Sequence, residues 1–356
     1  MMPYGTSPEN VRPADDMDAL VCEFGSMNAP SPIASDLLTI RPFRDTDAAA
    51  LPAIFREAVE VLGARHYTPE QVRAWAALAP PSDAFLEGTR DGRSVWVAAD
   101  ATERAVAYAD LRTDGTIDHL YCAPPAAGRG IGAALVLTLE AVARLQGLGR
   151  LRTEASEGAR ALFERLGWRT VRRQRVECDG TALHNDAMER ELPPIPADAA
   201  PTPATEAMMA EFVGTGSQSG GATAHTVVAF GDGPAMADEL AALVVAGPKR
   251  ATAGLLRDFV NGEPMPVVGG HVVLVNGSNE PRAVWRTREV RVGPIEDVDE
   301  AFAWDEGEGD RTRADWLAMH RRYFADAAER EGLAFHDRLP TVFERFAVVW
   351  PLRHAD

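Results

Sequence analysis

The chain has 356 residues, 46% of them hydrophobic, and a formal net charge of −17 at pH 7. This length predicts two domains, each with its own core. The negative charge argues against non-specific binding to nucleic acid or to an anionic membrane, because such binding needs a basic surface. No apolar run approaches the roughly 20 residues of a membrane span, and the first residues are too acidic for a signal peptide. We therefore expect no membrane contact.

The cysteines and histidines add two further expectations, and the lysine count adds one observation. Cys22, Cys122 and Cys178 are scattered and odd in number, which predicts reduced thiols in a cytoplasmic protein. The eight histidines show no metal-ligand spacing, so no metal is expected. Of the 36 basic residues 35 are arginines, and Lys249 is the single lysine.

The first hundred residues predict a disordered leader over residues 1–35, followed by short elements. Leu37–Pro42 is predicted as a strand, and the apolar spacing within Asp47–Leu62 predicts a helix. Thr68 and Gln71 form a capping box that announces a second helix. For the preceding stretch, residues 65–67, contact with a substrate and a simple connecting loop both stay open. Two strands, residues 94–99 and 105–112, follow.

The most informative stretch, Thr116–Leu135, is predicted as a strand, a loop and a helix. Two prolines end the strand, and Gly128, Gly130 and Gly132 follow. Glycines let the backbone approach a ligand, and the unpaired amides at a helix start favour an anion such as a pyrophosphate. A P-loop is excluded because no Lys-Ser or Lys-Thr pair closes the glycines. A dinucleotide-binding fold would need a different glycine spacing.

The phrase IDHLYCAPPAAGRGIGAALV resembles the acetyl-CoA-binding strand, loop and helix of the GNAT N-acetyltransferases. The resemblance implies an α/β domain with a mixed, mostly antiparallel sheet and flanking helices. It also implies acetyl-CoA as co-substrate and a small-molecule amine as acceptor. It assigns cofactor binding to Leu120, Tyr121, Cys122, Ala127, Gly128, Arg129, Gly130, Ile131, Gly132 and Ala133. Ala127 replaces the usual Gln or Arg, so one side-chain contact is missing, and a purely structural glycine turn is the alternative.

Acetyl transfer needs a base for the amine proton, and Asp118 and His119 are the candidates. Strict alternation would place His119 on one strand face with Ile117 and Tyr121, and Asp118 on the other with Leu120 and Cys122. An exposed polar strand end is the structural alternative for both candidates.

The next segment predicts a strand at Arg150–Ala155 and a helix from Ser156 to Leu166. The phrase EGARALFERLGW resembles the GNAT segment that often holds a tyrosine acting as acid on the departing thiolate. Phe163 stands at that position, so water, another group or direct thiolate departure must serve. Paired strands at 172–176 and 182–190 would close a transferase domain spanning residues 36–192.

Residues 193–222 are rich in Pro, Ala, Gly and Ser, and predict a partly extended linker with a helical turn at Met208–Phe212. The two halves are expected to fold independently. The second domain, residues 223–356, predicts an α+β unit with helices after Pro234 and Thr312, and strands at 267–276, 282–292 and 341–350.

Three phrases of the second domain, GPKRAT, AWDEG and ERF, resemble the ASCH family, which has a small PUA-like β-barrel fold. Some ASCH proteins are implicated in RNA binding, and some hydrolyse N4-acetylcytidine through a Lys, a Thr and a Glu. Carried over, these fall on Lys249, Thr252 and Glu306, with Glu308 as a rival. A neutral lysine could activate a threonine hydroxyl. Three readings stay open: an amidohydrolase, a non-catalytic module for RNA or a modified nucleoside, and a surface lysine at a helix end.

Overall fold

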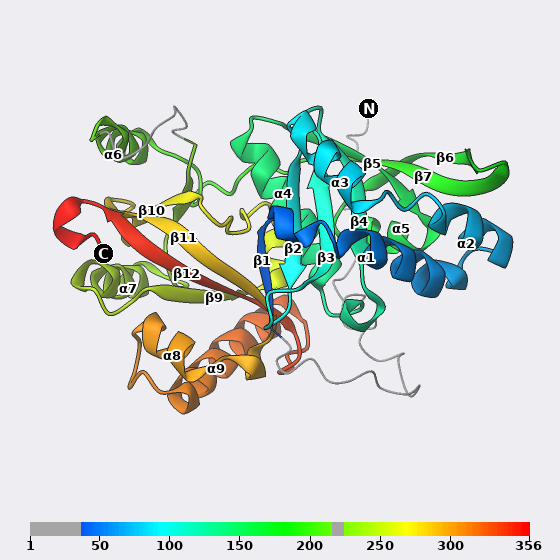
Figure 1. Ribbon diagram of the computed structural model, residues 1–356. Helices are drawn as coiled ribbons and strands as arrows, with labels where there is room; N and C mark the ends of the chain where they lie inside the picture. Colours follow the sequence, from blue (N-terminus) through cyan, green and yellow to red (C-terminus); the bar gives the residue numbers. More distant parts are fainter. Residues whose placement is uncertain (1–36, 216–223) are drawn as a thin grey trace, which may run out of the picture.

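The protein was analysed as a computed structural model, which describes residues 37–215 and 224–356 (Figure 1). Its strands are β1 Leu38–Pro42, β2 Ser94–Ala99, β3 Ala105–Leu111, β4 Thr116–Cys122, β5 Arg150–Ser156, β6 Arg169–Cys178, β7 Thr181–Glu191, β8 Thr226–Val228, β9 Ala251–Leu255, β10 His271–Val275, β11 Pro281–Pro294 and β12 Pro340–Trp350. Its helices are α1 Leu51–Glu57, α2 Pro69–Ala76, α3 Ser82–Gly88, α4 Ile131–Leu145, α5 Glu157–Arg165, α6 Pro203–Gly214, α7 Pro234–Ala246, α8 Glu300–Glu306 and α9 Arg313–Glu331.

One mixed sheet runs through both halves of the described chain, in the order β6-β7-β5-β4-β3-β2-β1-β11-β10-β8. Strand β11 connects the two halves because it is long enough for two strands, β10 and β1, to pair with successive parts of the same edge. Its first part pairs with β10, and Leu38 and Thr39 of β1 lie opposite Val292 and Arg291 further along. The other edge of β11 pairs with β12. The N-terminal and C-terminal sheets are therefore one structure, as Figure 1 shows.

The two halves also share a hydrophobic core. Val292 and Val342 from the second half belong to the same buried cluster as Leu38, Ile40 and the apolar residues of α4. Burial of these side chains depends on both halves, and apolar burial is the main stabilising term in folding. The expectation that the halves fold independently is therefore not supported by this packing.

Local signals for helix ends agree with the structure. Thr68 accepts a hydrogen bond from the Gln71 amide at 3.3 Å, and the Gln71 side chain accepts from the Thr68 amide at 3.0 Å. Ser156 caps α5, and Thr312 caps α9. The predicted helix over 47–62 is shorter as α1 and then continues as a π-helical turn.

The predicted linker contains a packed helix. Helix α6 begins after a Thr202 cap and buries Met209 and Phe212 against Val273 and Val284. The prediction of an extended linker with one helical turn is therefore wrong for residues 203–214. These residues form a full helix because its apolar side chains, at helical spacing, pack against the second half of the chain. The predicted leader, residues 1–35, lies outside the described residues.

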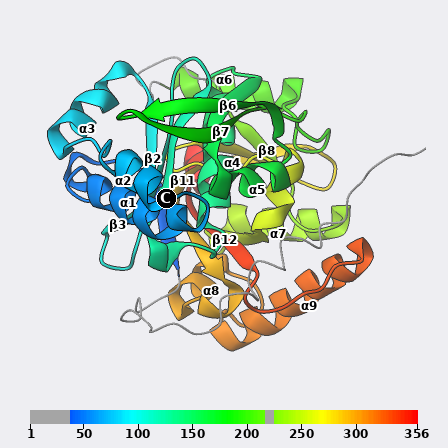
Figure 2. The same cartoon turned by 90° about the vertical axis from the view of Figure 1, so that its right-hand side faces the viewer.

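A closed PUA-like barrel is not present among the described strands. The C-terminal strands follow the order β8-β10-β11-β12-β9, and β8 does not pair with β9. Helices α8 and α9 lie at the opposite end of the molecule from the β6–β7 hairpin (Figure 2). None of the helices within the described ranges is long and apolar enough to cross a bilayer.

Candidate active site

The glycine loop between β4 and α4 adopts a conformation that glycine favours. Gly128 and Gly130 have φ angles of 75° and 80°, in the left-handed region. A Cβ added to Gly128 would meet nothing within 4 Å, whereas one added to Gly130 would lie 2.8 Å from Pro340. Helix α4 begins directly afterwards at Ile131, so its first backbone amides are available to an anion near the open side of Gly128.

The ten residues assigned to cofactor binding lie together at this end of β4 and the start of α4, but they differ in what they expose. Ile131 and Ala133 are buried, so their side chains serve the core and only their backbone could reach a ligand. Leu120 and Cys122 also pack against this core, and burial raises the pKa of the Cys122 thiol to about 12. Gly128 is exposed, and Ala127 and Arg129 are half-buried.

Strands β4 and β5 separate next to this loop. They pair in parallel only where Thr116 lies opposite Arg152 and Ile117 opposite Thr153. Beyond these residues the facing edges of β4 and β5 are not paired with each other, although β4 keeps its pairing with β3 and β5 with β7. An extended chain could hydrogen-bond to such an open strand edge.

A register shift in β4 changes the expected alternation. Ala109 of β3 lies opposite Leu120, but Leu111 lies opposite Ile117, so one extra residue is accommodated near Asp118 and His119. Ile117 therefore belongs to the core against which Leu120 and Cys122 pack, while His119 and Tyr121 have adjacent rings 6.1 Å apart. The prediction that Ile117 shares a face with His119 and Tyr121 is wrong, because strict period-two alternation fails at a bulge.

Asp110 organises the polar part of the site. Its carboxylate is fully buried, lies 2.8 Å from His119 Nδ1 and accepts hydrogen bonds from the Asp118 and His119 amides. Arg93 Nη1 donates to the same carboxylate at 2.7 Å. Burial acts to raise the pKa of Asp110, but the hydrogen bonds and charges of His119 and Arg93 outweigh it and hold that pKa below its usual value.

Asp118 has a different environment from His119. Its carboxylate accepts hydrogen bonds from Arg112 Nη2 at 2.6 Å and from Arg93 Nη1 at 3.2 Å. Within the described chain, one side-chain ligand atom each from Asp110, Asp118 and His119 lies within 4.8 Å of the others, a spacing compatible with a cation. The guanidinium of Arg93 already contacts both carboxylates, so their charge is compensated within the protein.

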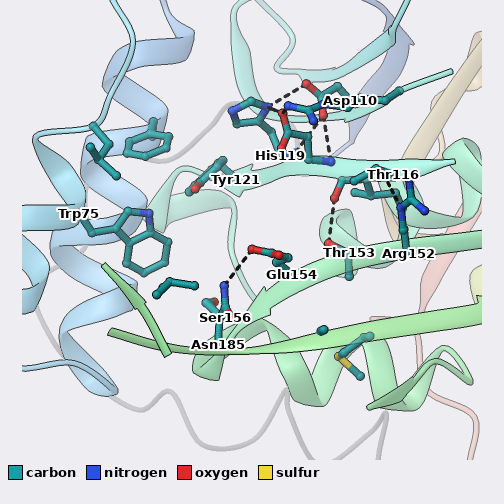
Figure 3. Close-up of a pocket in the computed structure, with 18 of the residues that line it drawn as sticks. Trp75, Asp110, Thr116, His119, Tyr121, Arg152, Thr153, Glu154, Ser156 and Asn185 are labelled. Atoms are coloured by element: carbon teal, nitrogen blue, oxygen red, sulfur yellow. Dashed lines mark hydrogen bonds and ion pairs between the residues drawn. The ribbon is translucent and has the colours of Figure 1, made fainter. Parts of the chain in front are cut away.

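These residues line a cavity of about 1050 Å³ (Figure 3). Tyr67, Trp75 and Tyr121 contribute aromatic surface, and Glu154 and Asn185 face the same space from β5 and β7. Tyr67 donates to the His184 carbonyl at 2.9 Å and accepts from the Glu157 amide at 3.0 Å. Of the 65–67 stretch, Tyr67 thus both lines the cavity and ties the helical region to β7 and α5.

Phe163 does not reach this cavity. It is 1% exposed and packs edge-on against Trp168 at a centroid distance of 5.0 Å. Its position is therefore a core position, and the structure supplies no acid there. Tyr121 lines the cavity and carries a hydroxyl group. Burial raises the pKa of this hydroxyl, so it retains its proton at neutral pH.

In the second half, the structure brings Lys249 to Glu306 and Glu308 but not to Thr252. Lys249 is 1% exposed, and its Nζ lies 2.5 Å from Glu308 Oε1 and 3.6 Å from Glu306 Oε1. The surface-lysine reading is therefore wrong. No hydrogen bond joins Thr252 to Lys249 within the described chain, and Thr252 lies on β9 opposite Glu344 of β12.

His320 extends the Lys249 cluster. It is stacked on Trp316 at 3.8 Å, and its Nε2 lies 3.5 Å from Glu306 Oε1. Burial acts to raise the pKa of Glu306, but the charges of His320 and Lys249 hold it below its usual value. Burial lowers the pKa of His320, but Glu306 outweighs burial and raises it. The four groups form a charge-compensated cluster, and Lys249 lines neither the cavity beside His119 nor a smaller cavity beside Arg144 in the described chain.

Sequence reasoning missed Asp110, Arg93, His320 and Glu344. Asp110 had a usable signal, because it is the one charged residue in an otherwise apolar strand, AVAYADL, and buried charges are rare unless they are paired. Arg93 and His320 had no local signal for these roles, because Asp110 and Glu306 come from other elements of the fold. Glu344 stands in the ERF phrase, but the resemblance assigned it no role.

Comparison with known proteins agrees with these features. Residues 63–191 match the model of the acetyltransferase (GNAT) domain, and residues 226–350 match the ASCH domain. The chain is 32% identical over 148 residues to the uncharacterized N-acetyltransferase YafP of Escherichia coli K12, a match that covers 42% of this chain and 92% of YafP. The chain thus belongs to the GNAT N-acetyltransferases and carries an ASCH domain in its second half.

Two solved structures resemble the two halves. A GCN5-related N-acetyltransferase from Rhodopseudomonas palustris is 32% identical, with a TM-score of 0.41, and the match covers 47% of this chain and all of that one. An ASCH domain from Lactobacillus crispatus is 27% identical, with a TM-score of 0.38, and the match covers 42% of this chain and 95% of that one.

Proposed function

We propose that the N-terminal half transfers an acetyl group from acetyl-CoA to a small-molecule amine, with His119 as the general base. The observation that carries this proposal is the buried Asp110 carboxylate that holds the His119 ring in a cavity beside the separating strands β4 and β5. The glycine loop would bind the pyrophosphate through amides, and the open strand edge would bind the extended pantetheine arm.

In the reaction, the amine nitrogen attacks the thioester carbonyl carbon, a C–N bond forms and the C–S bond breaks. Asp110 faces Nδ1 of His119, which leaves Nε2 to accept the proton that the amine loses. Asp118 is a weaker candidate for the base, because its carboxylate already forms ion pairs with the guanidinium groups of Arg93 and Arg112. We assign protonation of the departing thiolate to Tyr121, a protonated hydroxyl within the same cavity.

The test is release of the CoA thiol by the full chain, with a panel of primary amines as acceptors. His119→Ala is expected to lower kcat by about 10²–10⁴-fold, the usual contribution of a positioned base. Asp118→Ala is the matched control and should lower it much less. Full activity of the His119→Ala variant would remove His119 from this role.

Cofactor binding needs a separate test that avoids damage to packing. Gly128 is the position for it, because Asp and Asn tolerate its left-handed conformation better than other residues and no neighbour lies within 4 Å of an added Cβ. Gly128→Asp and Gly128→Asn differ only in charge. Calorimetry should show acetyl-CoA affinity about tenfold weaker for Asp than for Asn, because a carboxylate repels the pyrophosphate. Equal affinities would move the phosphate site elsewhere.

For the ASCH half, amide hydrolysis of an acetylated nucleoside is the second candidate function. The observation that favours it is the burial of Lys249 with Glu306, two of the three residues that the family resemblance assigns. Thr252 would have to approach Lys249 for this chemistry. Deacetylation of a nucleoside panel should be lost in both Lys249→Arg and Thr252→Val. Binding of nucleosides or RNA without turnover would support a recognition module instead.

A further inference from the structure

More carboxylates than guanidinium groups line the proposed acceptor cavity. Three guanidiniums line it, and each is engaged: Arg93 with Asp110 and Asp118, Arg112 with Asp118, and Arg152 with Asp114. An anionic acceptor would therefore find its cationic partners already paired. Five carboxylates line the same cavity, namely Asp110, Asp114, Asp118, Glu154 and Glu189.

Glu154 is the lining carboxylate that meets no cation among the described residues. Asp110, Asp118 and Asp114 have the arginines named above, and Glu189 pairs with Arg169. Along β5 the alternation sends Leu151 and Ala155 into the core and Glu154 toward the cavity. Among the described residues its carboxylate has one hydrogen-bond partner, the neutral Asn185 Nδ2 at 3.3 Å. Figure 3 marks this hydrogen bond.

Aromatic rings line the cavity that Glu154 faces. The rings of Tyr67 and Trp75 are 5.4 Å apart, and those of Trp75 and Tyr121 are 6.4 Å apart. Hydrogen bonds of Tyr67 and of Gln71 to β7 carbonyls hold α2 in place over the cavity. Such rings bind alkyl chains through their apolar surface and ammonium groups through their faces.

We propose that the acceptor is an aliphatic amine with a second cationic group, and that Glu154 binds this second cation while the aromatic rings contact the carbon chain. This inference rests on the proposed transferase function and names its substrate class. The net charge of −17 would also attract such a dication to the protein. Glu154 is then a specificity-determining residue, and it is distinct from the His119 base.

The experiment compares 1,4-diaminobutane with 4-amino-1-butanol, which have similar length but differ by one positive charge. For the wild type we expect kcat/KM about threefold to fivefold higher for the diamine, because Glu154 is exposed and an ion pair at an exposed carboxylate is weak. In Glu154→Gln this ratio should fall to about one, mainly through a higher KM for the diamine. Glu189→Gln is the matched control and should keep the wild-type ratio, because Arg169 already neutralises Glu189.

Two outcomes would overturn the proposal. One is equal use of both acceptors by the wild type, and the other is an equal fall in kcat for both acceptors in Glu154→Gln, which would mark Glu154 as a proton-transfer group. Calorimetry with 1,4-diaminobutane alone separates this inference from the transferase function. Diamine binding that is lost in Glu154→Gln supports the site even without turnover, and absence of diamine binding by the wild type refutes it.

Discussion

Gly130 of the transferase half lies directly against Pro340 of the ASCH half. A Cβ placed on Gly130 would be 2.8 Å from Pro340 Cγ and 2.9 Å from its Cβ, with Leu256 3.3 Å away. Gly130 is the last residue before α4, and Pro340 is the first residue of β12. The loop proposed to bind pyrophosphate therefore rests on the second half of the chain, and Gly130 is needed for packing as well as for its backbone conformation.

This contact predicts different costs at the two left-handed glycines. Gly128→Ala should lower the free energy of unfolding by about 1–2 kcal/mol, from backbone strain alone. Gly130→Ala should add about 1–3 kcal/mol for overpacking against Pro340. Urea unfolding measures both, and in a double-mutant cycle Pro340→Gly should recover part of the Gly130→Ala loss. Equal costs at the two glycines would contradict the contact.

The shared sheet and core predict that the halves stay together after the chain is cut. A specific protease site placed within residues 216–223 lies outside the described structure and between α6 and β8. After cleavage, the two fragments should elute as one species, because β1 remains paired with β11 and Val292 remains in the common core. Separation into two stable, independently melting fragments would restore the expectation drawn from the sequence.

Asp110→Asn should lower kcat by about 100-fold or more, because the amide neither orients His119 in the same way nor compensates its positive charge. Asp118→Asn is the matched control. The stability effect has a defined sign. The pKa of Asp110 is lowered in the folded state, so its contribution is present above the ordinary carboxyl value near 4 and is lost as pH falls through the folded value. The stability difference between wild type and Asp110→Asn should shrink in acid.

The contribution of Glu344 to stability should depend on pH in the opposite sense to that of Asp110. It is buried, accepts from Thr287 Oγ1 at 2.6 Å and from Trp285 Nε1 at 3.1 Å, and burial raises its pKa to about 7. A raised carboxyl pKa means that the folded state holds the proton more tightly, so stability falls as pH rises from about 4.5 to 7. Glu344→Gln should therefore gain stability relative to wild type between pH 5 and 8, by at most about 3 kcal/mol. A difference that is independent of pH would show that Glu344 is ionised throughout.

Removal of Lys249 should destabilise the protein, because its buried partner Glu306 then loses one of its counter-charges. Lys249→Met leaves Glu306 buried with His320 as its remaining counter-charge, and breaking a buried pair costs about 3–5 kcal/mol. Lys249→Met combined with Glu306→Gln should cost less than the single change. Urea unfolding of both variants checks this, and unchanged stability of Lys249→Met would mean that the pair contributes nothing to folding.

The sequence alone determined the features that depend on neighbours along the chain. The glycine loop between β4 and α4 follows from residues that permit positive φ, and the Thr68–Gln71 box and the Ser156 cap follow from side chains that reach an amide three residues away. Together with the phrases that resemble known families, these features located both domains and the glycine loop that we propose as the pyrophosphate site.

The tertiary structure decided what depends on distant contacts. The pairing of β1 with β11, the packing of Pro340 on Gly130 and the burial of Lys249 each join segments at least 50 residues apart, and no local pattern encodes such partners. The bulge at Asp118 and His119 was also not predicted from the sequence. One extra residue there reverses the predicted strand face of every later residue. Asp110 acquires its role only there, where β3 places its buried carboxylate against the displaced His119.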